Sequence, residues 1–291
     1  MGQLFRGHPL RQPYGIHNRR QLFLRRFVVC YRLTFNRRIG LHPMTHSSDL
    51  INQLKGFTLI EMAIVLMIVG LLLGGILVPL SAQMEQRNIS DTQKTLSEIK
   101  EAIIGYALAN GQLPCPADPF IATGLTNAGI SRTTCTTAAN STGVLPWATL
   151  GVSETDAWGN RYTYRVTSDF ADAIGNSTYG GCTPSPTPTL ATFGLCSVGN
   201  LDVLSAASGG VTIAGNVPAV IISHGKNGAG AYTPNGTQLA VGSNADEQEN
   251  SDGSTDNNYV SHTSTSTFDD IVVWISPNIL LNRMVTAGKL P

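Results

Sequence analysis

Residues 57–80 form an apolar stretch of 24 residues in which Glu61 is the only charged side chain. A stretch of this length is enough to cross a bilayer as a single helix. A carboxylate within such a helix costs about 2.5–3.5 kcal/mol even on lenient scales, so an acid found there is a candidate functional residue. The alternative is an ordinary membrane anchor that tolerates one acid. A polar segment precedes the stretch, whereas a secretory signal peptide has its cleavage site behind the apolar core.

The junction in front of the stretch has the sequence Gly-Phe-Thr-Leu-Ile-Glu, from Gly56 to Glu61, followed by Met-Ala-Ile-Val. This string resembles the prepilin cleavage and methylation motif of type IV pilins and type II secretion pseudopilins. The resemblance implies that prepilin peptidase cuts after Gly56 and that Phe57 becomes an N-methylated mature N-terminus. It also implies that Glu61 pairs with the terminal amine of a neighbouring subunit. A buried carboxylate needs such a cationic partner, because breaking a buried ion pair costs about 3–5 kcal/mol.

The resemblance implies a single-pass protein of the bacterial inner membrane, with a periplasmic head domain that can reach the cell surface in a filament. Its partners would be prepilin peptidase, membrane lipid, an inner-membrane assembly platform and other pilins or pseudopilins. Charge agrees with a cytoplasmic N-terminus, because residues 1–56 hold ten of the nineteen lysines and arginines and one acid. The remainder holds nine basic and eighteen acidic residues, a balance that argues against general nucleic-acid binding.

Residues 1–43 carry nine arginines and no acid. An Arg-rich, acid-poor segment is typical of an organellar transit peptide. The alternative, which we favour, is an over-extended start or a disordered basic segment. Met44 would then begin a short polar leader over residues 44–56, similar to the leaders of the family.

Residues 81–110 are predicted to continue the helix with one apolar side, because apolar residues recur at spacings of three, four and seven. The stripe consists of Ile89, Leu96, Ile99, Ile103 and either Tyr106 or Ala107. Asn110 and Gly111 supply the stop signal. Residues 57–80 would therefore lie in membrane or in a filament core, and residues 81–110 would pack on a globular domain.

Four residues near the predicted membrane exit favour a bend in this helix: Gly70, Gly74, Gly75 and Pro79. Proline removes a backbone hydrogen bond and kinks a helix. Gly70 and Gly74 also match a close-packing motif, although glycine is simply frequent in membrane helices. The resemblance implies that this segment kinks or unwinds when subunits assemble.

Residues 111–291 are predicted to form a periplasmic, β-rich head domain, because the composition changes to Gly, Thr, Ser, Asn and Pro with short apolar runs. The predicted strands are residues 161–167, 217–223 and 268–275, with weaker candidates at 200–204, 210–214 and 259–263. A helix is predicted over residues 278–287, behind Ser276 and Pro277. The Pro-rich residues 183–189 and the acidic residues 244–258 are predicted to be exposed loops. The predicted fold class is α+β and pilin-like, with a long N-terminal helix packed on an antiparallel β-sheet and a short C-terminal helix.

Four cysteines follow the apolar stretch: Cys115, Cys135, Cys182 and Cys196. They allow three connectivities, of which proximity in sequence favours 115 with 135 and 182 with 196. A periplasmic or surface location makes disulfides plausible, each worth about 2–4 kcal/mol.

Residues 156–164 resemble the Asp-x-Trp-Gly-x-x-Tyr signature of pseudopilins, which the family places at the entry to its sheet. The four signature positions are Asp156, Trp158, Gly159 and Tyr162. Trp158 would cover the edge of the core and Gly159 would make the turn into a strand. We interpret the motif as a structural turn. Residues 223–228 likewise resemble a family segment behind a core strand, and their spacing does not match a phosphate loop.

Five acidic residues gather within eleven positions: Asp246, Glu247, Glu249, Asp252 and Asp256. Loops rich in oxygen ligands bind calcium when six to eight ligands converge. Their spacing departs from an EF-hand. Two interpretations stay open, a calcium site and a solvated acidic loop, and we expect no other cofactor.

The sequence shows no catalytic constellation, because only His224 and His262 lie beyond the apolar stretch, among ordinary serines and threonines. We therefore expect a structural subunit of a pilus or pseudopilus rather than an enzyme, and a minor rather than a major subunit. The alternative is a subunit at the filament tip whose loops bind a surface, a substrate or DNA. A membrane-anchored enzyme would need a cleft lined by titratable groups.

Overall fold

The computed structural model describes residues 56–172, 190–253 and 256–290, apart from the side chains of residues 75–80. The described residues from Leu59 onward belong to one compact unit. The basic segment 1–43, the predicted leader 44–56 except for Gly56, and the Pro-rich residues 183–189 lie outside the described residues. Within the described part, no helix offers a stretch both long and apolar enough to cross a membrane.

Helix α1 runs without a break from Leu59 to Asn110, 52 residues or about 78 Å at 1.5 Å per residue. It ends, as predicted, just before Gly111, whose positive φ of 73° suits glycine and whose N–H donates to the carbonyl oxygen of Ala107. The two halves of α1 differ in burial, as the apolar pattern predicts. Residues 57–73 are exposed, whereas the stripe along the second half contains fully buried side chains: Leu96, Ile99, Ile103 and Ala107.

A four-stranded antiparallel sheet forms the centre of the head, in the order β1-β2-β5-β7. Its strands are β1 (Thr142–Val144), β2 (Thr163–Val166), β5 (Ala219–Ser223) and β7 (Ile271–Ile275). All five residues of β5 are buried because both faces of the sheet are covered. Ile221 faces the cluster that contains the α1 stripe, and Ile222 faces the opposite cluster. The predicted strands at 161–167, 217–223 and 268–275 are confirmed, and β1 was not predicted.

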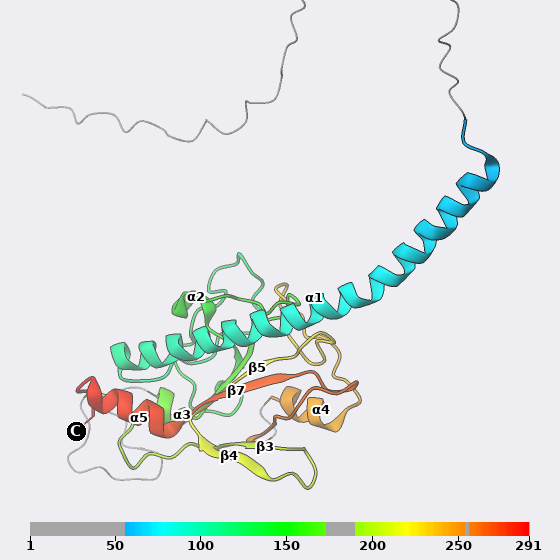
Figure 1. The fold of residues 1–291 in the computed structure, drawn as a ribbon. Coiled ribbons are helices and arrows are strands. Elements are labelled where there is room, and N and C mark those ends of the chain that lie inside the picture. The colour runs from blue at the N-terminus through cyan, green and yellow to red at the C-terminus, as the bar shows by residue number, and fades with distance from the viewer. Residues whose placement is uncertain (1–55, 173–189, 254–255, 291) are drawn as a thin grey trace, which may run out of the picture. The chain divides into compact units, whose positions relative to one another are not determined.

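A second sheet covers the face opposite α1, in the order β4-β3-β6. It consists of β3 (Leu201–Leu204), β4 (Thr212–Val217) and β6 (Asn258–Val260). Strands β3 and β4 are antiparallel, whereas β3 and β6 run parallel, which a purely antiparallel prediction does not anticipate. Figure 1 shows the layers, with α1 above β5 and β7 and with β3 and β4 below them.

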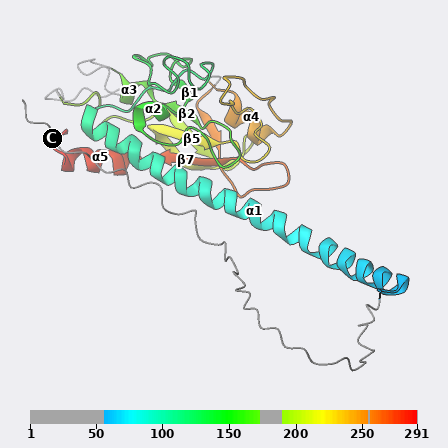
Figure 2. The same ribbon diagram turned by 90° about the horizontal axis from the view of Figure 1, so that it is seen from above.

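The described part of the head also contains four short helices: α2 (Trp147–Leu150), α3 (Ser168–Ala171), α4 (Ala245–Ser251) and α5 (Pro277–Thr286). The predicted C-terminal helix corresponds to α5, which buries Leu280 and Met284 in the same cluster as the α1 stripe. Seen from above, α1 lies alongside α5 and β7 (Figure 2). The structure is α+β, as predicted, and consistent with a pilin-like fold.

Candidate functional site

The predicted cleavage and assembly residues lie at the start of α1. Gly56 and Phe57 precede the helix, and Glu61 is in its first turn. Phe57 is 78% exposed, and large apolar side chains on every side of the following four turns are exposed as well. An apolar surface of this extent needs cover from lipid or protein.

The Asp-x-Trp-Gly turn ties two strands of the central sheet together. Asp156 Oδ1 accepts hydrogen bonds from the backbone N–H groups of Trp158 at 3.0 Å and Asn160 at 2.9 Å. Its Oδ2 accepts from the Ser223 hydroxyl at the end of β5, at 2.7 Å. Gly159 has a φ of 88°, a left-handed conformation that favours glycine. Burial raises the pKa of Asp156, and these hydrogen bonds act in the opposite direction.

The same turn contacts α1. The Ala157 N–H donates to the hydroxyl of Thr92 on the buried side of the helix, at 3.3 Å. Tyr162, the last signature residue, is fully buried in the cluster beneath α1, and Trp158 is half-buried. The arrangement fits a structural turn that anchors the head on the helix.

One disulfide joins Cys115 and Cys135, the pairing that proximity favours. It closes the loop that follows α1 and places both sulfur atoms in the core beneath the helix. Cys196 is also disulfide-bonded, and Cys182 lies outside the described residues.

The acidic segment is not the exposed loop that its composition predicts. Its first half forms α4, because Asn244 caps the helix by accepting from the N–H groups of Asp246 and Glu247. Glu247 and Asn250, three residues apart, share the inner face and are 3% and 1% exposed. The sequence contained the signal for this helix, an Asn N-cap followed by acids in the first turn.

The five acidic residues proposed for calcium face different surroundings. Asp246 accepts from the Ala207 N–H and lies 3.1 Å from His262 Nε2. Glu249 lies beside Asp256 and Asp252, and burial together with these two carboxylates raises its pKa to about 7.

Within the described part of the chain, one set of three potential metal ligands has atoms within 4.8 Å of one another: Glu247, Asp269 and Asp270. Asp269 and Asp270 immediately precede β7, and sequence reasoning did not select them. Burial, above all, raises the pKa values of Glu247 and Asp269, and the neighbouring carboxylates add to the effect.

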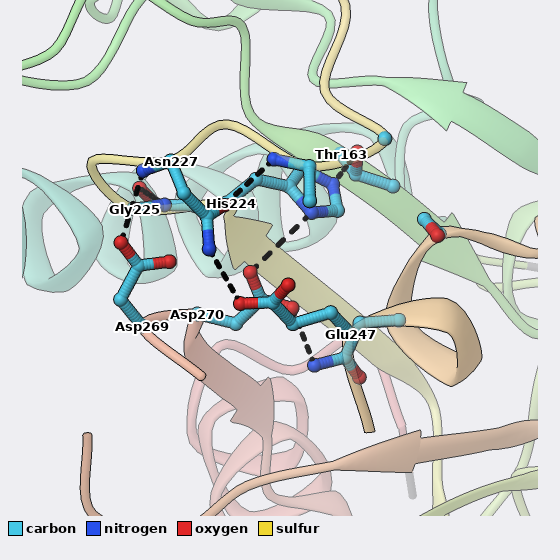
Figure 3. A network of polar contacts seen from close by, with 12 residues as sticks. Thr163, His224, Gly225, Asn227, Glu247, Asp269 and Asp270 are labelled. Carbon is cyan, nitrogen blue, oxygen red and sulfur yellow. Dashed lines mark hydrogen bonds and ion pairs between the residues drawn. The ribbon is translucent and has the colours of Figure 1, made fainter. Parts of the chain in front are cut away.

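A polar network surrounds this set (Figure 3). Asp269 Oδ2 accepts from the backbone N–H groups of Lys226 and Asn227 at 2.9 and 3.0 Å, and the Asn227 side chain donates to Glu247 at 2.6 Å. Gly225 allows the close approach, because a Cβ atom there would lie 2.4 Å from the Asp269 carbonyl oxygen. The loop behind β5 is thereby joined to α4 and to the start of β7.

His224 adjoins the three carboxylates and is fully buried. Its Nε2 is 2.8 Å from the Thr163 hydroxyl, and its Nδ1 is 3.6 Å from Asp270 Oδ1. A hydroxyl, an imidazole and a carboxylate in a row can support nucleophilic catalysis. All three side chains are buried, however, so the arrangement favours a structural role.

The comparisons with known proteins agree with the N-terminal motif. The model of the prokaryotic N-terminal methylation motif matches residues 52–77. Neither the curated proteins nor the solved structures gave a match. The motif confirms the predicted resemblance and supports a pilin-like or pseudopilin-like protein of the type IV pilin and pseudopilin family. Proteins with this motif are generally processed by prepilin peptidase and assemble with other pilins, which suggests a membrane-anchored, non-enzymatic protein.

Proposed function

We propose that the protein is a structural subunit of a type IV pilus or a type II secretion pseudopilus. In this proposal residues 44–56 are the leader that prepilin peptidase removes, and residues 57–80 hold the subunit in the inner membrane before an assembly platform moves it into the filament. Residues 81–110 carry the periplasmic head, residues 111–291. The supporting observation is the match to the methylation motif at the start of a helix whose first half is apolar and exposed.

Exposed apolar residues surround the first half of α1, so the helix needs an apolar environment both before and after assembly. Contacts between the first half of α1 in one copy and the first half of α1 in each neighbour would repeat from copy to copy. Contacts that do not close into a ring generate a fibre. Cleavage after Gly56 would create the amine at Phe57, and Glu61 of a neighbouring subunit would neutralise it away from water.

The test compares the same substitution at two positions of α1. Glu61→Val is expected to leave membrane insertion intact and to abolish recovery of the protein in sheared filaments. Glu98→Val is the control, because Glu98 is exposed on the second half and forms only a loose surface pair with Lys94 at 4.0 Å. Normal filament incorporation of Glu61→Val would refute the ion-pair argument.

Removal of the leader can be measured separately from assembly. Gly56→Ser is expected to slow removal of the leader, which intact-mass spectrometry of the purified protein detects. An unchanged mature mass would contradict cleavage at this bond.

A specific feature favours a second function, binding at the filament tip. The loop closed by Cys115 and Cys135 provides most of the lining of an open surface depression of about 410 Å³. Its lining residues include Ile130, Arg132 and Thr133. Ile130→Glu, at a half-exposed position of this lining, is expected to spare assembly and to reduce adhesion or uptake. Unchanged adhesion would contradict the tip role.

A further inference from the structure

We infer that an open surface depression beside Phe120 and Tyr232 binds an oligosaccharide. The depression has a volume of about 280 Å³ and is bordered by the loop at residues 118–123 and the hairpin at residues 231–239. Sites for drug-sized ligands usually measure roughly 300–1,000 Å³, so this one suits a smaller unit such as a sugar ring. The inference rests on the tip role proposed above for its biological setting, whereas binding itself is measured on the purified protein.

Phe120 provides a flat apolar surface for such a ligand. It is 68% exposed, and among the described residues of the head it is the only exposed aromatic side chain. Its ring is nearly perpendicular to that of Tyr232, with an interplanar angle of 87° and centroids 5.6 Å apart. In such a pair the edge of one ring meets the face of the other, so at least one face of Phe120 stays open. A sugar ring has a face of C–H groups that packs against the electron-rich face of an aromatic ring.

The hairpin adds polar groups on the same side as the tyrosine. Tyr232 and Gln238 are opposite each other in an antiparallel bridge, which places their side chains on one face of the hairpin. The Gln238 amide nitrogen donates to the carbonyl oxygen of Gly230 at 3.1 Å. This bond fixes the amide through its nitrogen and leaves its oxygen to accept from a ligand hydroxyl.

Arg132 connects this depression to the one of about 410 Å³ described above, because it lines both. Its Nη1 donates to the carbonyl oxygens of Asn140 and Thr142 at 3.1 and 2.9 Å. In the part of the chain that the structure describes, Arg132 forms no ion pair with a carboxylate. Two depressions that share a fixed guanidinium group can hold consecutive units of one ligand, which favours an oligosaccharide over a single sugar.

The lining of the smaller depression argues against other classes of ligand. One base and one acid line it, Arg132 and Asp252, so it lacks the strong charge that a highly charged ligand needs. A lipid chain needs an enclosed apolar cavity, whereas this depression is open and lined largely by polar side chains and glycine. Sugar hydroxyls both donate and accept hydrogen bonds, which suits a mixed set of donors and acceptors beside an aromatic ring.

A buried arginine holds the two borders of the depression together. Arg161 is fully buried, and its Nη1 donates to the carbonyl oxygen of Pro119 while its Nη2 donates to that of Pro234, both at 3.0 Å. The first carbonyl directly precedes Phe120, and the second lies in the turn two residues after Tyr232. The aromatic pair is therefore fixed before a ligand arrives, which lowers the entropy lost on binding.

A glycan array that spans neutral and acidic oligosaccharides tests the inference. The full-length protein is applied in lauryldimethylamine oxide, because a maltoside detergent would itself present sugar rings. Binding to at least one oligosaccharide is expected, and isothermal titration with that compound then gives the dissociation constant. Binding to no oligosaccharide on the array would overturn the proposal. Because the array needs no filament, this outcome is separable from a failure of assembly.

Substitutions at Phe120 locate the site. Phe120→Ala is expected to raise the dissociation constant about tenfold, because it removes the stacking surface. Phe120→Tyr keeps the ring and is expected to bind within about twofold of the wild type. Equal affinity of Phe120→Ala and wild type would overturn this location, and equal losses in both variants would refute stacking on the ring.

Leu125→Ala is the matched control. Leu125 is 63% exposed within the same disulfide-closed loop and lines neither depression. Its affinity and melting temperature are expected to equal those of the wild type, and a loss of binding as large as that of Phe120→Ala would contradict the site. Gln238→Ala, at an exposed position, gives a second test if Phe120→Ala does not fold, and unchanged affinity there would remove the hairpin from the site.

Discussion

Replacing Asp156 with alanine tests whether the Asp-x-Trp-Gly turn anchors the central sheet. The change removes an acceptor that serves three donors, the N–H groups of Trp158 and Asn160 and the hydroxyl of Ser223. Each such hydrogen bond contributes about 1 kcal/mol net, so the free energy of unfolding is expected to fall by about 3 kcal/mol. For a protein of this size the melting temperature should drop by roughly 6–12 °C.

Differential scanning calorimetry of the full-length protein in detergent measures this change. Asp118→Ala is the matched control, because Asp118 also accepts from a backbone N–H two residues ahead, that of Phe120, but at an exposed site. Its melting temperature is expected to fall by less than about 4 °C, since a single exposed hydrogen bond contributes at most about 1 kcal/mol. If Asp156→Ala melts no lower than Asp118→Ala, the turn does not hold the sheet through these hydrogen bonds.

Two further predictions concern the head. Replacing both Cys115 and Cys135 with serine is expected to lower the free energy of unfolding by about 3 kcal/mol, because the disulfide closes a loop of 20 residues. An unchanged calorimetric transition would contradict this. Asp156→Asn should gain stability relative to the wild type as the pH rises from about 3.5 to 7. The reason is that the folded-state pKa of Asp156 is raised above 3.8, so its stabilising contribution is complete below pH 3.8 and declines above it. If the difference in free energy of unfolding between Asp156→Asn and the wild type stays constant over this pH range, the pKa shift is contradicted.

The elements that depend on local patterns were predictable from the sequence. The stripe that includes Leu96, Ile99 and Ile103 predicts the buried side of α1, because helical spacing places these residues on one face. Gly111 predicts where α1 ends, and Ser276 with Pro277 predicts where α5 begins. In each case neighbours in the sequence provide the whole signal, and the fold does not override it.

Pairing between distant strands was not predictable. Strand β1 has only three residues, Thr142–Val144, and its identity as a strand comes from β2 beside it. The parallel pair of β3 and β6 joins Asp202 to Asn258 and Val203 to Tyr259, with more than fifty residues between the partners. No periodicity within either strand indicates such a partner, because register depends on burial against the other sheet.

The cluster of Glu247, Asp269 and Asp270 likewise depends on contacts between distant segments, which the sequence does not indicate. Composition selects residues 246–256 because acids are close together there, yet adjacency along a helix directs side chains to different faces. Glu247 turns inward while its neighbour Gln248 is exposed, and the inward face meets Asp269 and Asp270 from another segment. Like charges brought together in a buried place oppose folding unless something compensates them. The acids that could hold a metal ion are therefore the ones whose burial is least favourable, and only the folded chain identifies them.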